Sequence, residues 1–296
     1  MRDEYAGLII MIAATLFFSF MNIFVKITLA ELPFMETVFF RGVFGTIFVV
    51  MYLLSQRKPL IGPRPFLLSL RGLLGFLGLS CYYFTMSKLT LADTVILNRI
   101  SPLFVMILSY FILKEILSRW HVVVLLMAMV GIFNIVQPQM DFAPIAGLIG
   151  LLSSVFSAGA YIVVKKLSSD HNAFQIVLAF VFLSALLSVP FLFNNFMLPD
   201  GPTWLLLADI GFTSALAQIL MTKAYALGSP TPVSIASYGI FIFSALWGYL
   251  LWGEIQNPQA LIGSGIVITC MLSLPFLNRR VQAIKSEKRI RPVSEV

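Results

Sequence analysis

One arginine stands inside an apolar segment of the chain, next to an asparagine. Arg99 lies within the apolar stretch 92–113 and directly follows Asn98. A guanidinium group in hydrocarbon is costly, so it usually faces a protein interior or a water-filled cavity. Its planar fork of donors matches the geometry of carboxylate and phosphate groups. The segment therefore predicts an anion-binding position about 10 Å below one membrane face, at 1.5 Å per residue.

The step Ser101-Pro102, close behind the arginine, predicts an irregular helix. Proline has no N–H and leaves a carbonyl one turn earlier without its helical partner. Irregular backbone at membrane depth is tolerated where it faces protein or a water-filled cavity. Two partners for Arg99 remain open at this point. One is a structural acid, Asp93 or Glu36, and the other is a substrate anion, which we favour because the acids fall near the ends of apolar stretches.

Polar side chains at helical spacing accompany Arg99 in other apolar stretches. Asn22 belongs to a polar stripe of the first stretch, and Arg71 and Tyr82 share one face of the third with glycines. Gln218 and Tyr238 lie on polar and aromatic faces of the eighth and ninth stretches. The predicted substrate-binding residues are Arg99, Asn98, Arg71, Tyr82, Asn22, Tyr238 and Gln218.

Each of these positions has a structural alternative. Ser and Thr side chains bond back to their own helix, and faces with glycine are often packing seams. Arg71 lies close enough to the cytoplasmic headgroups to snorkel, and for Arg41, Lys223 and Lys26 we favour that role. Trp252 is assigned to the aromatic belt at the membrane interface.

The composition predicts a membrane protein. The chain has 296 residues, of which 59% are hydrophobic and 11% charged, with a mean hydropathy of +0.95. A soluble domain is about 25% charged and could not hide this much apolar surface. The net charge of +7 does not indicate nucleic acid, because the basic residues sit in short connections and not on one face. Cys81 and Cys270 lie in apolar stretches and are interpreted as buried small hydrophobes, not as a disulfide or metal pair.

We expect an all-α integral membrane protein with ten transmembrane helices. Each apolar stretch has the length that a hydrocarbon core of about 30 Å requires. The first one, after Asp3 and Glu4, is interpreted as a mature helix and not as a cleaved signal. The predicted spans are 5–27, 36–54, 65–87, 92–113, 120–137, 145–165, 173–193, 203–226, 232–252 and 258–277.

The distribution of Lys and Arg predicts the orientation. Nearly all basic residues of the connections fall on the side of the N-terminus, whereas only Lys26 and Lys88 fall on the other. This asymmetry places both termini in the cytoplasm, in a multi-pass protein of the inner (plasma) membrane. Residues 278–296 are expected to form a loose, basic cytoplasmic tail.

The chain also contains a weak internal repeat. A shift of 140 residues matches Gly7 with Gly147 and Lys26 with Lys166. We predict two five-helix repeats, 5–137 and 143–277. Because five is odd, the second repeat enters the membrane inverted, which is the arrangement of many secondary transporters.

Several local motifs then resemble the EamA-like, ten-helix branch of the drug/metabolite transporter superfamily, over about residues 5–277. They are Leu89-Thr90-Leu91-Ala92-Asp93, Ser101-Pro102-Leu103-Phe104, Leu113-Lys114-Glu115, and the segment from Ala224-Tyr225-Ala226-Leu227-Gly228 through Glu254. The resemblance implies a five-plus-five fold and a central cavity lined by the first, third and fourth spans of each half. The second half departs from the pattern by having Phe241 where the first half has Pro102.

We therefore expect a secondary transporter that moves a small anionic or zwitterionic organic metabolite by alternating access. Amino-acid-like, carboxylate and nucleoside-type substrates all fit. No glycine-rich loop ending in Gly-Lys-Ser/Thr occurs, and His121 and His171 lie at span ends without metal-ligand spacing. We expect no catalysis, cofactor, metal or nucleic acid, with lipid and a small molecule as partners; whether the chain dimerises stays open. The alternative is a non-transporting membrane enzyme or assembly scaffold, and coupling by exchange, facilitated diffusion or proton antiport is left open.

Overall fold

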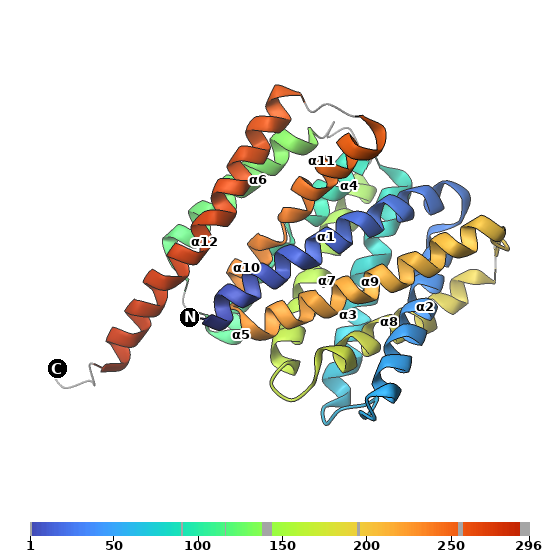
Figure 1. Ribbon diagram of the computed structural model, residues 1–296, viewed down its shortest axis with the longest axis horizontal. Coiled ribbons are helices and arrows are strands. Elements are labelled where there is room, and N and C mark those ends of the chain that lie inside the picture. The colour runs from blue at the N-terminus through green and yellow to red at the C-terminus, as the bar shows by residue number, and fades with distance from the viewer. Residues whose placement is uncertain are drawn as a thin grey trace.

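The computed structural model describes residues 2–89, 91–115, 117–137, 144–193, 196–253 and 257–290, and all regular secondary structure in these ranges is helical (Figure 1). Side chains are described throughout these ranges except at 2, 4, 91–93, 252 and 278–290. The helices are α1 (Arg2–Glu31), α2 (Phe34–Ser55), α3 (Pro65–Lys88), α4 (Leu91–Asn98), α5 (Ser101–Leu113), α6 (Arg119–Val136), α7 (Pro144–Leu167), α8 (Ala173–Leu192), α9 (Gly201–Leu227), α10 (Pro230–Ala236), α11 (Gly239–Trp252) and α12 (Pro258–Ile290).

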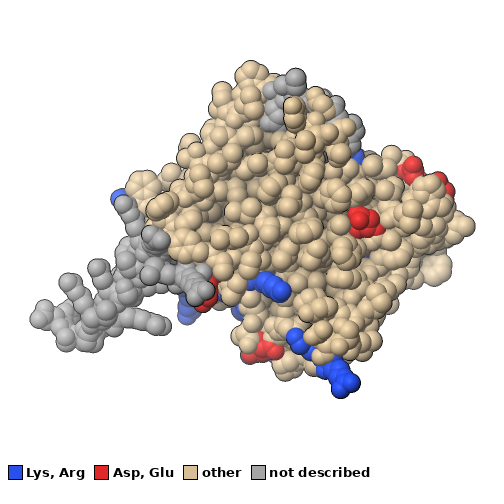
Figure 2. All heavy atoms as spheres, in the orientation of Figure 1, with Lys and Arg blue, Asp and Glu red and all other residues tan. Residues whose placement is uncertain are grey.

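Ten of the described segments are long and apolar enough to cross a membrane, which confirms the predicted number. Their bounds lie within a few residues of the predicted ones, because the length of an apolar run is itself the signal. On the face drawn in Figure 2, uncharged residues cover most of the surface, and the visible Lys and Arg lie mainly along the lower edge. That edge includes the connection between α2 and α3. The predicted orientation of the termini requires such an edge and stays a prediction.

The fourth and ninth spans are each broken into two helices. Pro102 is near the start of α5, and Arg99 and Ile100 form a turn between α4 and α5, at the place where the proline predicted an irregular helix. The ninth span breaks at Ser237 and Tyr238 without a proline. Gly239 follows this second break, and a Cβ there would approach the Thr15 hydroxyl to 3.0 Å. Phe241 stands where the first half has Pro102, yet the ninth span is still divided at the position equivalent to the division of the fourth span.

The packing of the helices has the same pattern in both halves. α1 packs on α9 as α7 packs on α3, and α2 packs on α9 as α8 packs on α3. The two broken spans also correspond, since α5 packs on α7 and α11 on α1. The pairs α2–α8 and α6–α12 join equivalent spans of the two halves. An inverted repeat requires these pairings, so they support the predicted relation of the two halves, which stays a prediction. Glu254, where the second-half motif ends, lies outside the described residues.

The expectation of a loose tail is wrong for residues 278–290. α12 continues to Ile290, so these residues are helical beyond the apolar part that ends at Leu277. Their composition explains this, because Arg, Lys, Glu, Ala and Gln are good helix formers even without a buried face. Residues 291–296 lie outside the described part of the chain.

Polar caps begin several helices at the ends of the bundle. Ser118 and His121 form a reciprocal cap on α6, and Asn172 and Gln175 form another on α8. Asp200 caps α9 by accepting a 2.9 Å hydrogen bond from the Thr203 N–H, and hydrogen bonds from Thr203 lower the pKa of this carboxyl. Among the described residues, no three His, Cys, Asp or Glu side chains gather to hold a metal ion.

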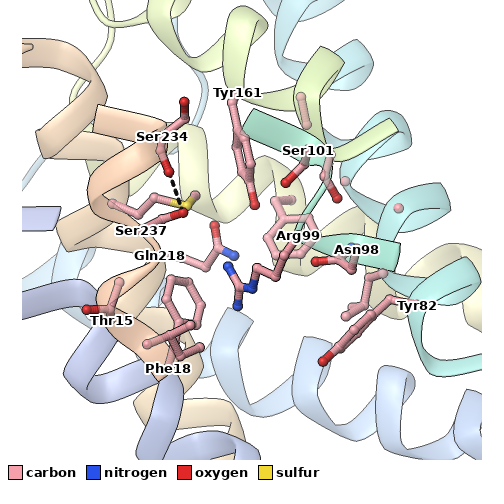
Figure 3. A pocket seen from close by; sticks show the side chains of 18 of the residues that line it. Thr15, Phe18, Tyr82, Asn98, Arg99, Ser101, Tyr161, Gln218, Ser234 and Ser237 are labelled. Atoms are coloured by element: carbon pink, nitrogen blue, oxygen red, sulfur yellow. Dashed lines mark hydrogen bonds between the residues drawn. The ribbon is translucent and has the colours of Figure 1, made fainter. Parts of the chain in front are cut away.

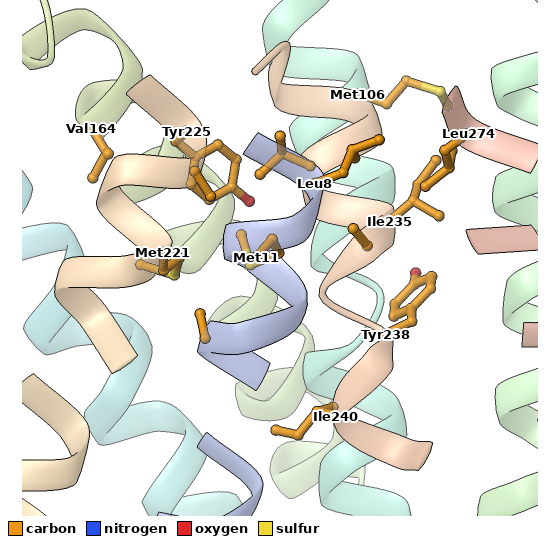
Figure 4. Close-up of a cluster of buried hydrophobic side chains, with 14 of the residues drawn as sticks. Leu8, Met11, Met106, Val164, Met221, Tyr225, Ile235, Tyr238, Ile240 and Leu274 are labelled. Carbon is orange, nitrogen blue, oxygen red and sulfur yellow. The ribbon is translucent and has the colours of Figure 1, made fainter. Parts of the chain in front are cut away.

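A hydrophobic cluster closes the end of the molecule that holds the N-terminus. Figure 4 shows Leu8 and Met11 of α1 among side chains from α5, α7, α9, α10 and α12. Leu8, Met11 and Ile235 are all 5% exposed or less. The cluster joins both halves, so this end is packed and closed.

The crossing of α6 and α12 depends on two glycines. A Cβ on Gly263 would lie 2.5 Å from the carbonyl oxygen of Gly131, which is backbone and cannot rotate away. We expect Gly263→Ala to lower stability by about 1–3 kcal/mol, the usual effect of overpacking. Thermal unfolding of purified protein measures this effect. Gly265→Ala, on the same helix with nothing within 4 Å, is the matched control and should leave the midpoint unchanged or higher. Equal midpoints for the two variants would contradict the close crossing.

Candidate functional site

A cavity of about 120 Å³ lies between the two halves, and polar side chains from both line it. It is bounded by the first, third and fourth spans of each half, as the family resemblance implied. The second spans contribute as well, through Arg41 of α2 and Phe180 of α8. The cavity meets the hydrophobic cluster at Met11, Met221 and Tyr225, which belong to both. Its opposite end includes Asn22 and Tyr82, which lie in the later parts of α1 and α3 and are half-buried.

Arg99 extends from the break between α4 and α5 into this cavity. Figure 3 shows its guanidinium group among Gln218, Phe18 and Thr15, with Asn98 and Tyr82 to one side. The guanidinium carbon lies 5.8 Å from the centre of the Phe241 ring, within cation–π range. The arginine therefore presents its donors to the cavity from an irregular point of the fourth span.

Tyr238 supports Arg99 but does not line the cavity. Its side chain is fully buried, and its hydroxyl donates a 3.0 Å hydrogen bond to the carbonyl oxygen of Arg99. The break in the ninth span thus satisfies a backbone acceptor at the break in the fourth. Helical spacing predicted a place on the cavity wall, whereas the hydroxyl turns toward α4; a role of Tyr238 in substrate binding stays a prediction.

Asn98 joins the halves beside the arginine. Its side-chain amide donates a 3.0 Å hydrogen bond to the Ser153 hydroxyl of α7, while the residue also lines the cavity. Thr15 lines the cavity too, although its hydroxyl bonds back to the Ile12 carbonyl. Ser19 accepts a 3.0 Å hydrogen bond from the Trp247 indole and does not line the cavity. The polar stripe of the first span therefore divides between cavity and packing.

Arg71 does not snorkel to the headgroups. It is 1% exposed, and its Nη2 donates a 3.1 Å hydrogen bond to Oε1 of Gln218. Its guanidinium carbon lies 4.6 Å from the centre of the Phe180 ring. A Cβ at Gly75 would collide with this guanidinium group and with Phe180. The glycines of the third span therefore leave space for a buried cation at the cavity.

Arg41 is the main cavity residue that the sequence did not assign to the site. It is 4% exposed, and its guanidinium carbon lies 5.7 Å from the same Phe180 ring. The expectation that it snorkels is wrong. The signal was its depth within α2, which resembles that of Arg71 within α3. Lys223 and Lys26 are exposed and outside the cavity lining, in keeping with their assigned role.

None of the described residues that line the cavity is acidic. Glu36 accepts a 2.7 Å hydrogen bond from the Met197 N–H, and its other oxygen is buried without a partner, so it does not pair with Arg99. The side chain of Asp93 lies outside the described residues. The ion pair found among the described side chains joins Arg64 to Asp170 at 2.7 Å, and it does not involve a cavity arginine. The arginines of the cavity thus have no described acid as partner.

Several aromatic and hydroxyl residues of the cavity were not singled out from the sequence. They carry no charge, and aromatic side chains at helical spacing are more often packing residues. The packing of α7 on α3 and α5, which the sequence does not show, brings the α7 residues to the site. These lining residues are Phe18, Tyr83, Ser157, Tyr161, Phe180 and Ser234.

Ten apolar spans around a polar central cavity define a polytopic membrane protein built to admit a small solute. The profile of the EamA-like transporter family matches residues 5–137 and 144–274. The chain belongs to this family, and it is a transporter of small metabolites, not an enzyme.

Named relatives extend over nearly the whole chain. A pseudopaline exporter of Pseudomonas aeruginosa is 34% identical over 91% of this chain and 95% of its own length. An S-adenosylmethionine uptake transporter of Rickettsia bellii is 27% identical over 84% of this chain and 86% of its own. A solved crystal structure with 20% sequence identity matches with a TM-score of 0.80, over 94% of this chain and 99% of that one, which supports the fold alone.

Proposed function

We propose that this transporter moves a small anionic or zwitterionic organic metabolite across the inner membrane by alternating access. Arg99 carries the proposal. Its guanidinium group points into the cavity from the break of the fourth span, and no described acid pairs with it. Such a group binds a carboxylate or phosphate through charge-assisted hydrogen bonds.

Zwitterions fit the site because polar neutral groups surround the arginine. Asn22, Tyr82 and Gln218 offer donors and acceptors to the cavity. They can bind an ammonium or hydroxyl group of a substrate whose acidic group is bound by Arg99. A cavity lined by these groups also argues against the scaffold alternative, which predicts packed apolar side chains in the centre.

The conformation supports alternating access with the cavity closed toward the cytoplasm. The hydrophobic cluster fills the end that holds the N-terminus, which the Lys and Arg distribution assigns to the cytoplasmic side. The half-buried cavity residues Asn22 and Tyr82 lie toward the other end. Transport then requires the clustered ends of α1, α5 and α10 to separate.

Binding to purified protein tests the proposed substrate class. A thermal-shift screen against amino acids, organic acids, nucleosides and nucleotides should select anionic or zwitterionic compounds. A ligand at a hundred times its Kd adds about 2.7 kcal/mol to the stability of the folded state. Selection of cationic or uncharged compounds alone would contradict the proposal.

We propose export as the direction to test first, because the 34% identical relative is named an exporter. The uptake transporters among the relatives are the reason to measure both directions. In cells that lack the gene, the substrate found in the screen should accumulate inside. Accumulation outside would favour uptake.

We expect the transport rate to be indifferent to an imposed pH gradient. Protons need a titrating group that the substrate also reaches, and no described lining residue is acidic. Exchange or facilitated diffusion is therefore favoured. Proteoliposomes loaded with unlabelled substrate should take up labelled substrate equally at matched and at unequal pH. A rate that follows the pH gradient would instead show proton coupling.

A further inference from the structure

The cavity contains more positive charge than one carboxylate can balance. Arg41, Arg71 and Arg99 all line it, and no described lining residue is acidic. A charge removed from water is costly unless an opposite charge or strong hydrogen bonds compensate it. The inference below rests on the proposed function, in which Arg99 binds an acidic group.

Arg41 and Arg71 form a second positive position beside the one at Arg99. Both guanidinium groups lie within cation–π range of the same ring, at 5.7 and 4.6 Å from the centre of Phe180. The two cations are therefore close enough to repel each other. We call Arg41, Arg71, Tyr83 and Phe180 the Phe180 subsite.

Two donors of the Phe180 subsite are buried and unused. Nε of Arg71 has no hydrogen-bond partner in the described part of the protein, although the residue is 1% exposed. The hydroxyl of Tyr83, also 1% exposed, lies close to Arg41, which can only donate to it, so the Tyr83 O–H has no acceptor among the described residues. Unpaired buried donors are costly, and each one in a native structure needs an explanation. An acceptor supplied by a ligand would satisfy both.

Neutral protein groups do not supply that acceptor. Gln218 accepts one hydrogen bond from Nη2 of Arg71, which leaves Nε and the charge itself uncompensated. Glu36 and Asp209 each have a buried carboxylate oxygen without a partner, but neither residue lines the cavity. A second acidic group on the substrate fits both the charge and the free donors.

We propose that the substrate carries at least two acidic groups, one bound by Arg99 and another by the Phe180 subsite. The subsite then sets specificity, because a substrate with a single carboxylate leaves Arg41 and Arg71 unbalanced. The class is an organic di- or tricarboxylate, with or without amino groups.

Matched pairs of ligands test this proposal in purified full-length protein in lipid nanodiscs. Glutamate against glutamine, and glutamylglutamate against glutaminylglutamine, differ by acid and amide at nearly constant shape. We expect the diacid of at least one pair to bind at least tenfold more tightly than its amide. In Arg41→Gln and in Tyr83→Phe, the preference should fall toward equality while binding of the amide is kept. Arg71→Lys, which keeps the charge, should retain part of the preference.

Failure of this inference is distinguishable from failure of the proposed function. If no diacid exceeds its amide, or if the preference survives in both subsite variants, the second acidic group is refuted. Binding of chloride or sulfate that is lost in Arg41→Gln, without any preference for diacids, would make the subsite an inorganic-anion site and also overturn it. The proposed function falls separately, if Arg99→Ala binds and transports as the wild type does. If Arg41→Gln does not fold, Tyr83→Phe still decides the test, because it removes only one hydroxyl from the subsite.

Discussion

Arg99→Ala is expected to abolish transport of the substrate while the protein still folds. The side chain points into the cavity, and its described contact is a cation–π contact with Phe241 at 5.8 Å. Removing it leaves no described acid without a partner. A hydrogen bond to a charged group contributes about 1.5–3 kcal/mol, so losing a bidentate pair amounts to about 3 kcal/mol or more. That is roughly a hundredfold in affinity, because each 1.4 kcal/mol is tenfold.

Uptake of labelled substrate into proteoliposomes measures the effect, with thermal unfolding as the check on folding. Arg99→Lys keeps the charge but loses the planar fork, so it should retain partial activity. Lys26→Ala is the matched control, since Lys26 lies on the stripe predicted for the first span yet is exposed and outside the cavity lining. Unchanged transport in Arg99→Ala would refute the site, and loss of transport in Lys26→Ala would show that the assay does not report on it.

The number and limits of the spans were predictable because a bilayer imposes one length on every crossing helix. The break at Arg99 was predictable for a local reason as well, since Pro102 removes a helical hydrogen bond. The break at Ser237 and Tyr238 has no such signal. The continuation of α12 to Ile290 was missed because polarity was taken to predict loose chain, although the residues are good helix formers.

The charge of a side chain and its depth in a span were enough to predict most of the site. Six of the seven predicted residues line the cavity, and the seventh, Tyr238, holds the carbonyl of Arg99 from behind. Helical spacing fixes which residues share a face but not which face meets the centre. Arg41 was assigned to the headgroups from its depth alone, whereas the packing of α2 on α8 and α9 turns it to Phe180.

Glu115→Ala is expected to open the cavity from the end that holds the N-terminus. The Glu115 carboxylate follows α5 and accepts hydrogen bonds from Ser109 and, at 2.9 Å, from Thr231 at the start of α10. Ser109 and Thr231 are fully buried, and their hydroxyl oxygens lie 3.2 Å apart. The two broken spans, one from each half, are therefore tied together at the closed end. Alternating access requires this tie to release.

Labelling of a cysteine in the cavity measures the opening. Ser237 lines the cavity, so Ser237→Cys, with Cys81 and Cys270 replaced by alanine, reports which side admits a membrane-impermeant thiol reagent. Losing two hydrogen bonds to a carboxylate, at about 1.5–3 kcal/mol each, shifts the balance of closed and open forms by roughly a hundredfold or more. Labelling from the N-terminal side should rise accordingly in Glu115→Ala. Glu115→Gln keeps an acceptor oxygen and should show a smaller rise. Thr231 is one of the two described hydroxyl donors to Glu115, so Thr231→Val should act in the same direction. Labelling that stays confined to the opposite side in all three variants would mean that the hydrophobic cluster, not this tie, keeps the end closed.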